Sequence, residues 1–328
     1  MTNQTTLLAA LQHASDLPSD PTRSRTDTAQ PGTGSSPEAL TRAASLQTYV
    51  TIRFLVDRGR ARQAFQAYAY FRWLDDALDR PEQGMVERAA LTSRQADLIE
   101  RLYRGETVVD LTAEERWLAE LIASDPNRPS GLEAYIRHLL AVMALDTRRR
   151  GLAISAAELA AYTHHLAAGV TEAMHYFIGH GRATPSGALR YRAVTGAHIT
   201  HMLRDTYDDL AAGYINIPAE VLTNARIGPD EIDSLPYRAW VEQRVRLARA
   251  CFADGKRYLS ALACRRCRVA GFAYTRRFEQ VLDLIETDGF RLRRSYPDRV
   301  SVGDLVRLGA EALQRAWQPT PIRVVSRA

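Results

Sequence analysis

Apolar residues recur at three- and four-residue spacing along almost the whole chain after residue 37, and this periodicity limits the fold more than any other feature. The spacing is that of an amphipathic helix, and no stretch shows the sustained alternation of a half-buried strand. The chain is therefore predicted to be all-α. The expected helices cover 37–57, 60–80, 84–104, 112–124, 130–148, 155–180, 187–212, 237–266, 270–287 and 301–317.

The first 36 residues differ in composition from the rest. Residues 15–36 are rich in Ser, Thr, Asp, Pro and Gly and hold one leucine, so burial cannot offset the entropy of ordering them. We expect a flexible leader over 1–36, which ends where Ser36, Pro37 and Glu38 form a helix start. Because no repeat or Gly/Ser linker follows, 37–328 is predicted to form one helical domain.

Length and composition exclude several classes of protein. Three cysteines in 328 residues rule out a disulfide scaffold, and no apolar run approaches the length of a membrane span. The N-terminus lacks the basic and apolar regions of a signal peptide. We expect a cytoplasmic protein whose contact with a membrane is at most peripheral.

The net charge of +5 is concentrated in residues 245–299, where 13 Arg or Lys accompany six Asp or Glu. A nucleic-acid-binding protein would show a groove-reading motif or an aromatic platform, and neither is present, so no nucleic acid partner is expected. The basic segment fits either a solvated helix face or a wall that attracts an anionic ligand.

The first informative motif interrupts an apolar helix. Arg72, Asp75 and Asp79 are spaced by three and four residues, so they share one helix face. Asp76 directly follows Asp75 and lies at the side of this face. Carboxylates four residues apart, without lysine partners, repel each other, and a multivalent cation removes that repulsion. We call Arg72, Asp75 and Asp79 the first acidic stripe.

A second acidic stripe follows some 130 residues later. It comprises His198, His201, Asp205 and Asp209, and Arg204 lies within it. An exposed acidic helix face would explain either stripe alone. If the two helices face each other, four carboxylates converge in a site suited to Mg²⁺, a hard cation that also coordinates phosphate.

The two motifs resemble those of the squalene/phytoene synthase family of isoprenoid synthases. The family pattern Y-x-x-x-R-x-x-D-D-x-x-D is matched from Tyr68 to Asp79. The pattern L-R-D-x-x-x-D-x-x-x-G-x-x-x-x-P is matched from Leu203 to Pro218. The resemblance covers roughly residues 40–300.

Two further segments carry the same resemblance. Tyr162 to Met174 resembles the family's Y-C-x-x-V-A-G-x-V-G-x-x-M helix. Upstream, Ser45, Thr48 and Tyr49 stand within the positions of the family's H-S-x-S-F segment. The chain is thus identified as a divergent member.

The resemblance implies a single-domain helical bundle of the isoprenoid synthase type with a central cavity. It also implies that two prenyl diphosphates, such as farnesyl or geranylgeranyl diphosphate, condense head to head through a cyclopropyl diphosphate to a squalene- or phytoene-type product. The implied catalytic residues are Arg72 and Arg204, which stabilise the leaving diphosphate, and Tyr49 and Tyr162, whose rings stabilise the cation. The implied ligands of Mg²⁺, or of Mn²⁺, are Asp75, Asp79, Asp205 and Asp209.

We expect the positions at which this chain departs from the family pattern to bind substrate. His198 and His201 replace the Gln and Asn of the family's Q-x-x-N, and imidazole prefers softer ions than Mg²⁺. Ala168 and Thr171 replace glycines of the Tyr162 helix, and Tyr214 replaces an arginine. Each change is expected to narrow the cavity or to alter the polarity of its wall. The upstream segment departs at Ser45, which replaces a histidine, and Thr48 lies in the same segment.

These departures leave alternatives open. A terpene cyclase or lyase that acts on one prenyl diphosphate, or a prenyltransferase with another acceptor, would use the same aspartates. A non-catalytic helical protein would have no reason to keep like charges stacked in a core. The sequence does not decide whether a nicotinamide reductant takes part, how long the substrate chain is, or what the oligomeric state is.

Overall fold

The computed structural model describes residues 36–80, 82–125, 127–179 and 184–296. Over these residues the chain is helical and has no β-strand beyond one isolated bridge between Ala153 and Ile215. The all-α prediction is thus confirmed. The predicted leader, apart from Ser36, and the predicted helix over 301–317 lie outside the described residues.

The N-terminal half differs from the prediction at one point. Ser45 has extended backbone (φ −156°, ψ 101°), ends one helix and caps the next by accepting the backbone N–H of Thr48 at 3.1 Å. The predicted continuous helix over 37–57 is therefore wrong. The elements of this half are α2 (Pro37–Ala44), α3 (Leu46–Leu55), the 3-10 turn η1 (Arg58–Arg60), α4 (Ala61–Leu78), α5 (Met85–Tyr103) and α6 (Ala113–Ala123).

The C-terminal half departs from the prediction in three places. The helix predicted over 187–212 begins later and breaks at Asp205, the seven-residue α11 was not predicted, and the loop before α13 lies at 262–264. Cys264 begins α13, since its Sγ accepts the N–H of Cys267 at 3.5 Å. The elements are α7 (Gly131–Arg149), α8 (Ala156–Ile178), α9 (Arg192–Arg204), α10 (Thr206–Ala211), α11 (Ala219–Ala225), α12 (Leu235–Ala261) and α13 (Arg265–Thr287).

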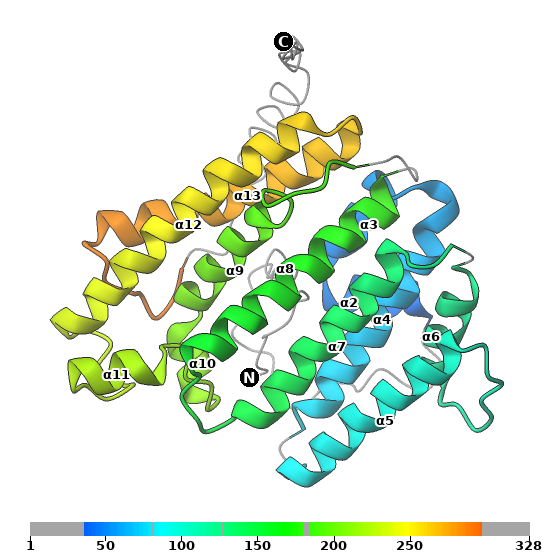
Figure 1. The fold of residues 1–328 in the computed structure, drawn as a ribbon, viewed down its shortest axis with the longest axis horizontal. Coiled ribbons are helices and arrows are strands. Elements are labelled where there is room, and N and C mark those ends of the chain that lie inside the picture. Colours follow the sequence, from blue (N-terminus) through cyan, green and yellow to red (C-terminus); the bar gives the residue numbers. More distant parts are fainter. Residues whose placement is uncertain (1–35, 81, 126, 180–183, 297–328) are drawn as a thin grey trace, which may run out of the picture.

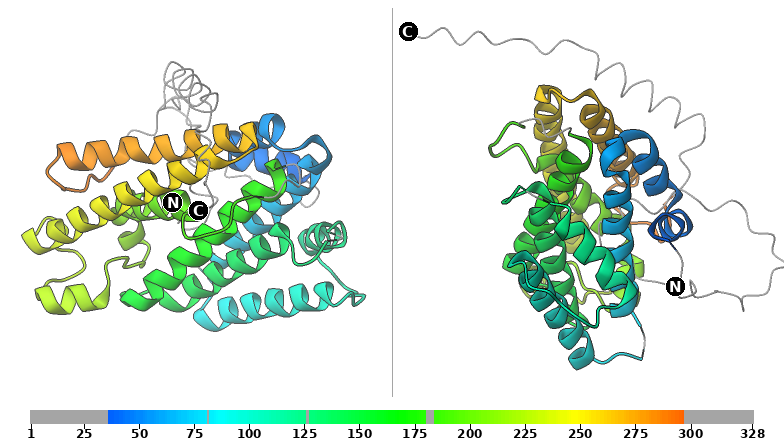
Figure 2. Two further views of the ribbon diagram at one scale, coloured as in Figure 1. Left: turned by 45° about the horizontal axis from the view of Figure 1, so that its top comes forward. Right: turned by 90° about the vertical axis from the view of Figure 1, so that its right-hand side faces the viewer.

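Helices α7 and α8 lie side by side through the middle of the molecule, and α12 and α13 form one edge (Figure 1). Helix α9 packs on α8, α12 and α13, while α5 and α6 lie at the opposite side (Figure 2). The buried apolar side chains form two clusters. One is built mainly from α4, α7 and α8, and the other mainly from α9, α12 and α13.

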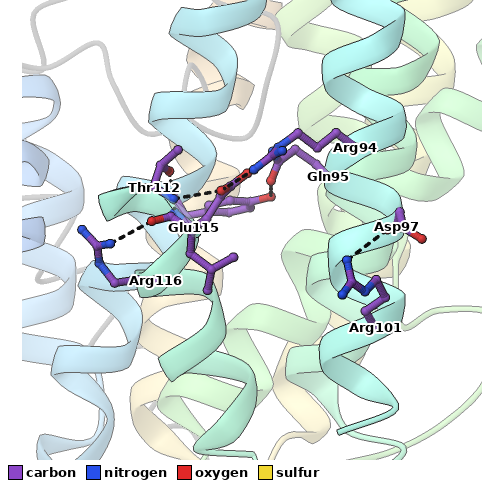
Figure 3. A network of polar contacts seen from close by, with 9 residues as sticks. Arg94, Gln95, Asp97, Arg101, Thr112, Glu115 and Arg116 are labelled. Atoms are coloured by element: carbon purple, nitrogen blue, oxygen red, sulfur yellow. Dashed lines mark hydrogen bonds and ion pairs between the residues drawn. The ribbon is translucent and has the colours of Figure 1, made fainter. Parts of the chain in front are cut away.

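A buried polar network fixes α4 against α5 and α6. Glu115, 1% exposed at the start of α6, accepts hydrogen bonds from Arg94 Nε at 3.0 Å and from Gln95 Nε2 at 2.9 Å (Figure 3). Tyr70 of α4 donates to Gln95 Oε1 at 2.9 Å. Because Tyr70 lies two residues before Arg72, the network holds the helix that carries the first acidic stripe.

None of the helices in the described ranges is both long and apolar enough to cross a membrane.

Candidate active site

The first acidic stripe ends in a cleft. Helix α4 stops at Leu78, and the N–H of Asp79 caps it by donating to the Asp75 carbonyl at 3.0 Å. Both carboxylates line a cleft that encloses about 310 Å³ including its mouth. The other lining residues come from α5, α7 and the loop after α10: Arg88, Met143, Asp146, Thr147 and Tyr214, with Leu78 of α4.

A third carboxylate, Asp146 of α7, reaches the same cleft and was missed from the sequence. It accepts hydrogen bonds from Tyr162 Oη at 2.9 Å and from Arg149 Nε at 2.7 Å. Burial raises its pKa, and Arg149 opposes that rise. An aspartate with an arginine three residues later usually indicates a surface ion pair. One sequence feature could have indicated that Asp146 lies in the interior: it directly follows the apolar run 138–145.

A chain of hydrogen bonds connects this carboxylate with the second acidic stripe. Arg149 Nη1 donates to Asn216 Oδ1 at 2.7 Å, and Asn216 Nδ2 donates to Asp209 Oδ2 at 2.6 Å. Arg149, Asn216 and Asp209 are all buried. We call Asp146, Arg149, Asn216 and Asp209 the polar bridge, since it joins α7 to α10.

The second stripe is split between two helices. Asp205 ends α9 and precedes α10 with φ −96° and ψ 9°, so the predicted single helix face is interrupted there. Its carboxylate accepts from Arg204 Nε at 2.5 Å and Nη2 at 2.8 Å. His201 Nε2 lies 3.3 Å from the same carboxylate. Asp205 and Asp209 are not among the residues that line the cleft.

One carboxyl of each stripe, that of Asp79 and that of Asp209, has a pKa raised toward its neutral form. Burial, and then the charge of Asp146, raise the pKa of Asp79 to about 6. Burial, and then the charge of Asp205, raise the pKa of Asp209 well above its usual range. Negative charge is therefore crowded on both sides of Asp146.

The donor set fits a hard cation. Within the described ranges, no three Asp, Glu, His or Cys side chains gather closely enough to hold a metal ion, so the predicted convergence of four carboxylates is not seen. The cleft nevertheless offers the oxygens of Asp75, Asp79 and Asp146. Burial and then the charge of Asp146 raise the pKa of Asp79, and a divalent cation would stabilise its ionised form.

The two predicted arginines are held by neighbouring aspartates. Arg72 forms a bidentate pair with Asp76, in which Nε lies 2.9 Å from Oδ2, and Arg204 pairs with Asp205. A different arginine lines the cleft. Arg88 of α5 is 9% exposed, and its Nε has no hydrogen-bond partner among the described residues. No motif surrounds Arg88, so sequence reasoning missed it.

The ring of Tyr162 is in contact with the side chains of His198 and Arg149. Its ring stacks on His198 at a centroid distance of 5.1 Å and an interplanar angle of 20°, and the Arg149 guanidinium lies 5.1 Å from its centroid. Burial lowers the pKa of His198 well below its usual value, so this imidazole is neutral. Its Nε2 has no hydrogen-bond partner within the described part of the chain. Tyr49 is half-buried, and the centroid of its ring lies 5.8 Å from that of the Phe65 ring.

The remaining predicted residues are buried but lie outside the cleft lining. Ser45 Oγ donates to Thr48 Oγ1 at 2.9 Å, so these two residues shape the start of α3. Ala168 and Thr171 are 1% and 2% exposed on α8.

The loop after α10 brings Tyr214 to the cleft. Gly213 has φ +89°, a conformation that glycine adopts without strain, and its carbonyl accepts from the Gly151 N–H at 2.7 Å. Tyr214 occupies the position where the family pattern has an arginine. The Arg149 guanidinium lies 4.9 Å from its ring centroid, so an arginine of α7 stands at this loop instead.

Comparison with known proteins decides the family. The sequence profile of squalene/phytoene synthases matches residues 41–305, most of the chain. The chain belongs to the squalene/phytoene synthase family. It is thereby a prenyltransferase of isoprenoid biosynthesis, as its motifs predicted.

A solved structure supports the fold. The chain resembles the crystal structure of squalene synthase HpnC from Alicyclobacillus acidocaldarius with a TM-score of 0.63 and 21% identity. The match covers 78% of this chain and 94% of that one. The predicted isoprenoid synthase fold is confirmed. A comparison with curated protein sequences finds no match.

Proposed function

We propose that this family member is a Mg²⁺-dependent prenyltransferase that condenses two prenyl diphosphates head to head. The observation that carries the proposal is the cleft that Asp75, Asp79 and Asp146 line together with Arg88. Carboxylates and a buried guanidinium are the groups that hold a cation and a diphosphate. Farnesyl and geranylgeranyl diphosphate are the proposed substrates, and the cytoplasm is the proposed location.

Asp75, Asp79 and Asp146 would hold Mg²⁺ in the cleft, and Asp205 and Asp209 would hold a further ion for a second diphosphate at the α10 end of the polar bridge. When bound, the ion supplies positive charge that stabilises the diphosphate as its C–O bond breaks. Mn²⁺ has the same preference for oxygen ligands.

The chain's own residues orient and shield the site. The Tyr162 hydroxyl and Arg149 fix both oxygens of Asp146, so its position is set before substrate binds. Arg88 contacts the diphosphate through its free Nε. Arg72 and Arg204 also contact it once they release Asp76 and Asp205. Apolar walls from α4, α7 and α8 keep water from the allylic cation. Tyr49 stabilises that cation at the α3 side.

The altered positions act on substrate choice. His198 and His201 present imidazole where the family pattern has amides, while Ala168 and Thr171 add volume to α8. With Ser45 and Thr48 at the start of α3, they set which second substrate is accepted.

A second candidate is a cyclase or lyase that acts on a single prenyl diphosphate. The replacement of two glycines of the family pattern by Ala168 and Thr171 favours it, because the added side chains leave less room for a second prenyl chain.

One experiment separates the two. The protein is incubated with Mg²⁺ and farnesyl or geranylgeranyl diphosphate, singly and in pairs, with and without NADPH, and the products are identified by mass spectrometry. A product with twice the substrate's carbon count supports condensation, and one of equal carbon count supports the cyclase. Asp75→Asn serves as the inactive control. If no prenyl substrate releases diphosphate, both candidates are wrong.

A further inference from the structure

Helix α3 exposes large apolar side chains on its outer face, while its inner face is buried. Its ten residues, LQTYVTIRFL, include a single charge, Arg53. Thr48 and Ile52 on the inner face are 4% and 5% exposed.

The outer face of α3 consists of Leu46, Val50, Arg53 and Phe54. Leu46, Val50 and Phe54 are 44%, 42% and 75% exposed, and their four-residue spacing places them in one row along the helix. Single exposed apolar residues are common on protein surfaces, but a continuous row on one helix marks a contact surface.

Positive charge surrounds this row. Arg42, Arg53 and Arg58 are exposed, and no acidic residue occurs between Glu38 and Asp57. The basic start of α13, residues 265–268, lies at the C-terminal end of α3, because Arg266 forms an ion pair with Asp57 there. Apolar residues with flanking arginines are typical of helices that lie in the interface of a membrane with anionic lipids.

We propose that the outer face of α3 docks on the surface of an anionic lipid bilayer. Leu46, Val50 and Phe54 enter the headgroup boundary, and the neighbouring arginines contact lipid phosphates. The benefit of such docking rests on the proposed function, since a hydrocarbon product has no polar group and needs a lipid phase to leave the enzyme. Ser45 and Thr48 then lie on the inner side of the helix that touches the membrane.

The first test is sedimentation of the full-length protein with vesicles and without substrate. Vesicles of phosphatidylcholine with phosphatidylglycerol should bind the protein, and pure phosphatidylcholine should bind it less. Phe54→Glu should weaken binding at least about tenfold. The matched control is Val109→Glu, which changes a residue exposed to the same extent (74%) in the loop before α6 and should bind as the unchanged protein does.

Charge is tested separately by Arg53→Gln. Binding should weaken about fivefold and become less dependent on salt, because one headgroup contact is lost. Equal binding of Phe54→Glu and the unchanged protein would overturn the proposal. Turnover of Phe54→Glu in detergent should be normal, so loss of vesicle binding is distinguishable from failure of the proposed function.

The second test asks whether something else covers the outer face. All three native cysteines are buried, so Phe54→Cys can be labelled selectively with a polarity-sensitive fluorophore. The label should report water in buffer and an apolar environment after anionic vesicles are added. An apolar signal in buffer would overturn the proposal. Dependence on protein concentration would then identify a second copy as the occupant, and independence would identify another part of the chain.

Discussion

The two acidic stripes have the same spacing of aspartates but different structures. Asp75 and Asp79 lie at the end of one continuous helix and open into a cleft. Asp205 and Asp209 are divided by a helix break, and both accept hydrogen bonds from neighbouring side chains. Pairs of aspartates with the same spacing in the sequence therefore differ in whether they line the cleft. The carboxylates of the first stripe line the cleft, whereas those of the second lie outside its lining and are bonded to Arg204 and Asn216.

The largest expected effect tests whether this difference matters for catalysis. Asp75→Asn and Asp205→Asn should each abolish turnover while leaving the helical content unchanged, because each removes a charge that the proposed metal sites need. Diphosphate release measures turnover, and circular dichroism measures the fold. If Asp205→Asn keeps its activity, the second stripe is structural and the two-site interpretation is wrong.

The polar bridge that joins the stripes should be important for stability. Arg149→Met leaves Asp146 as a buried carboxylate without its cation, which should cost about 3–5 kcal/mol of the free energy of unfolding. Urea denaturation measures this loss. Asp146→Asn combined with Arg149→Met should be less harmful than the sum of the two single changes, and simple additivity would contradict the bridge.

The crowding of charge in the first stripe predicts a pH dependence. The pKa of Asp79 rises from 3.8 to about 6 on folding, so its contribution to stability is present below about pH 4 and is lost as the pH rises through 6. Without metal at pH 7, Asp79→Asn should therefore stabilise the protein by about 3 kcal/mol while it removes activity.

Thermal unfolding of the Asp79→Asn variant at several pH values, with a chelator present, measures the effect. The gain should vanish near pH 3. Asp209→Asn should act in the same direction, because the pKa of Asp209 is also raised. A gain that does not depend on pH would show that it does not arise from this titration.

The smallest effect concerns the residue that supports the cleft from α8. Tyr162→Phe removes the hydrogen bond to Asp146 but keeps the stacking on His198, so it should cost about 1 kcal/mol in stability and less than about tenfold in turnover. A loss as large as that of Asp75→Asn would mean that the hydroxyl takes part in the chemistry.

Sequence reasoning was most successful where one helix determines the geometry. The period of apolar residues located most helices, and Ser36 with Pro37 correctly indicated the start of α2. The breaks at Ser45 and Asp205 were missed, because both residues lie in apolar or periodic sequence and their capping role depends on backbone conformation.

The same limit applies to the site. Asp75 and Asp79 were predicted to act together because they are neighbours on one helix. Asp146, Asn216 and Arg88 lie on three other segments, and only tertiary packing brings Asp146 and Arg88 to the cleft and Asn216 into the polar bridge. Spacing along the chain cannot reveal a contact between residues that are 67 positions apart.

The central place of Asp146 has a consequence for how the site binds protons. After burial, its charge is the next cause that raises the pKa of Asp79 at the end of α4, and it contributes, behind burial and Asp205, to the raised pKa of Asp209 on α10. Because an added proton removes a negative charge, protonation of Asp146 makes proton uptake by each of these two neighbours less favourable. Protonation of one carboxyl on α7 therefore lowers the proton affinity of one carboxyl in each stripe.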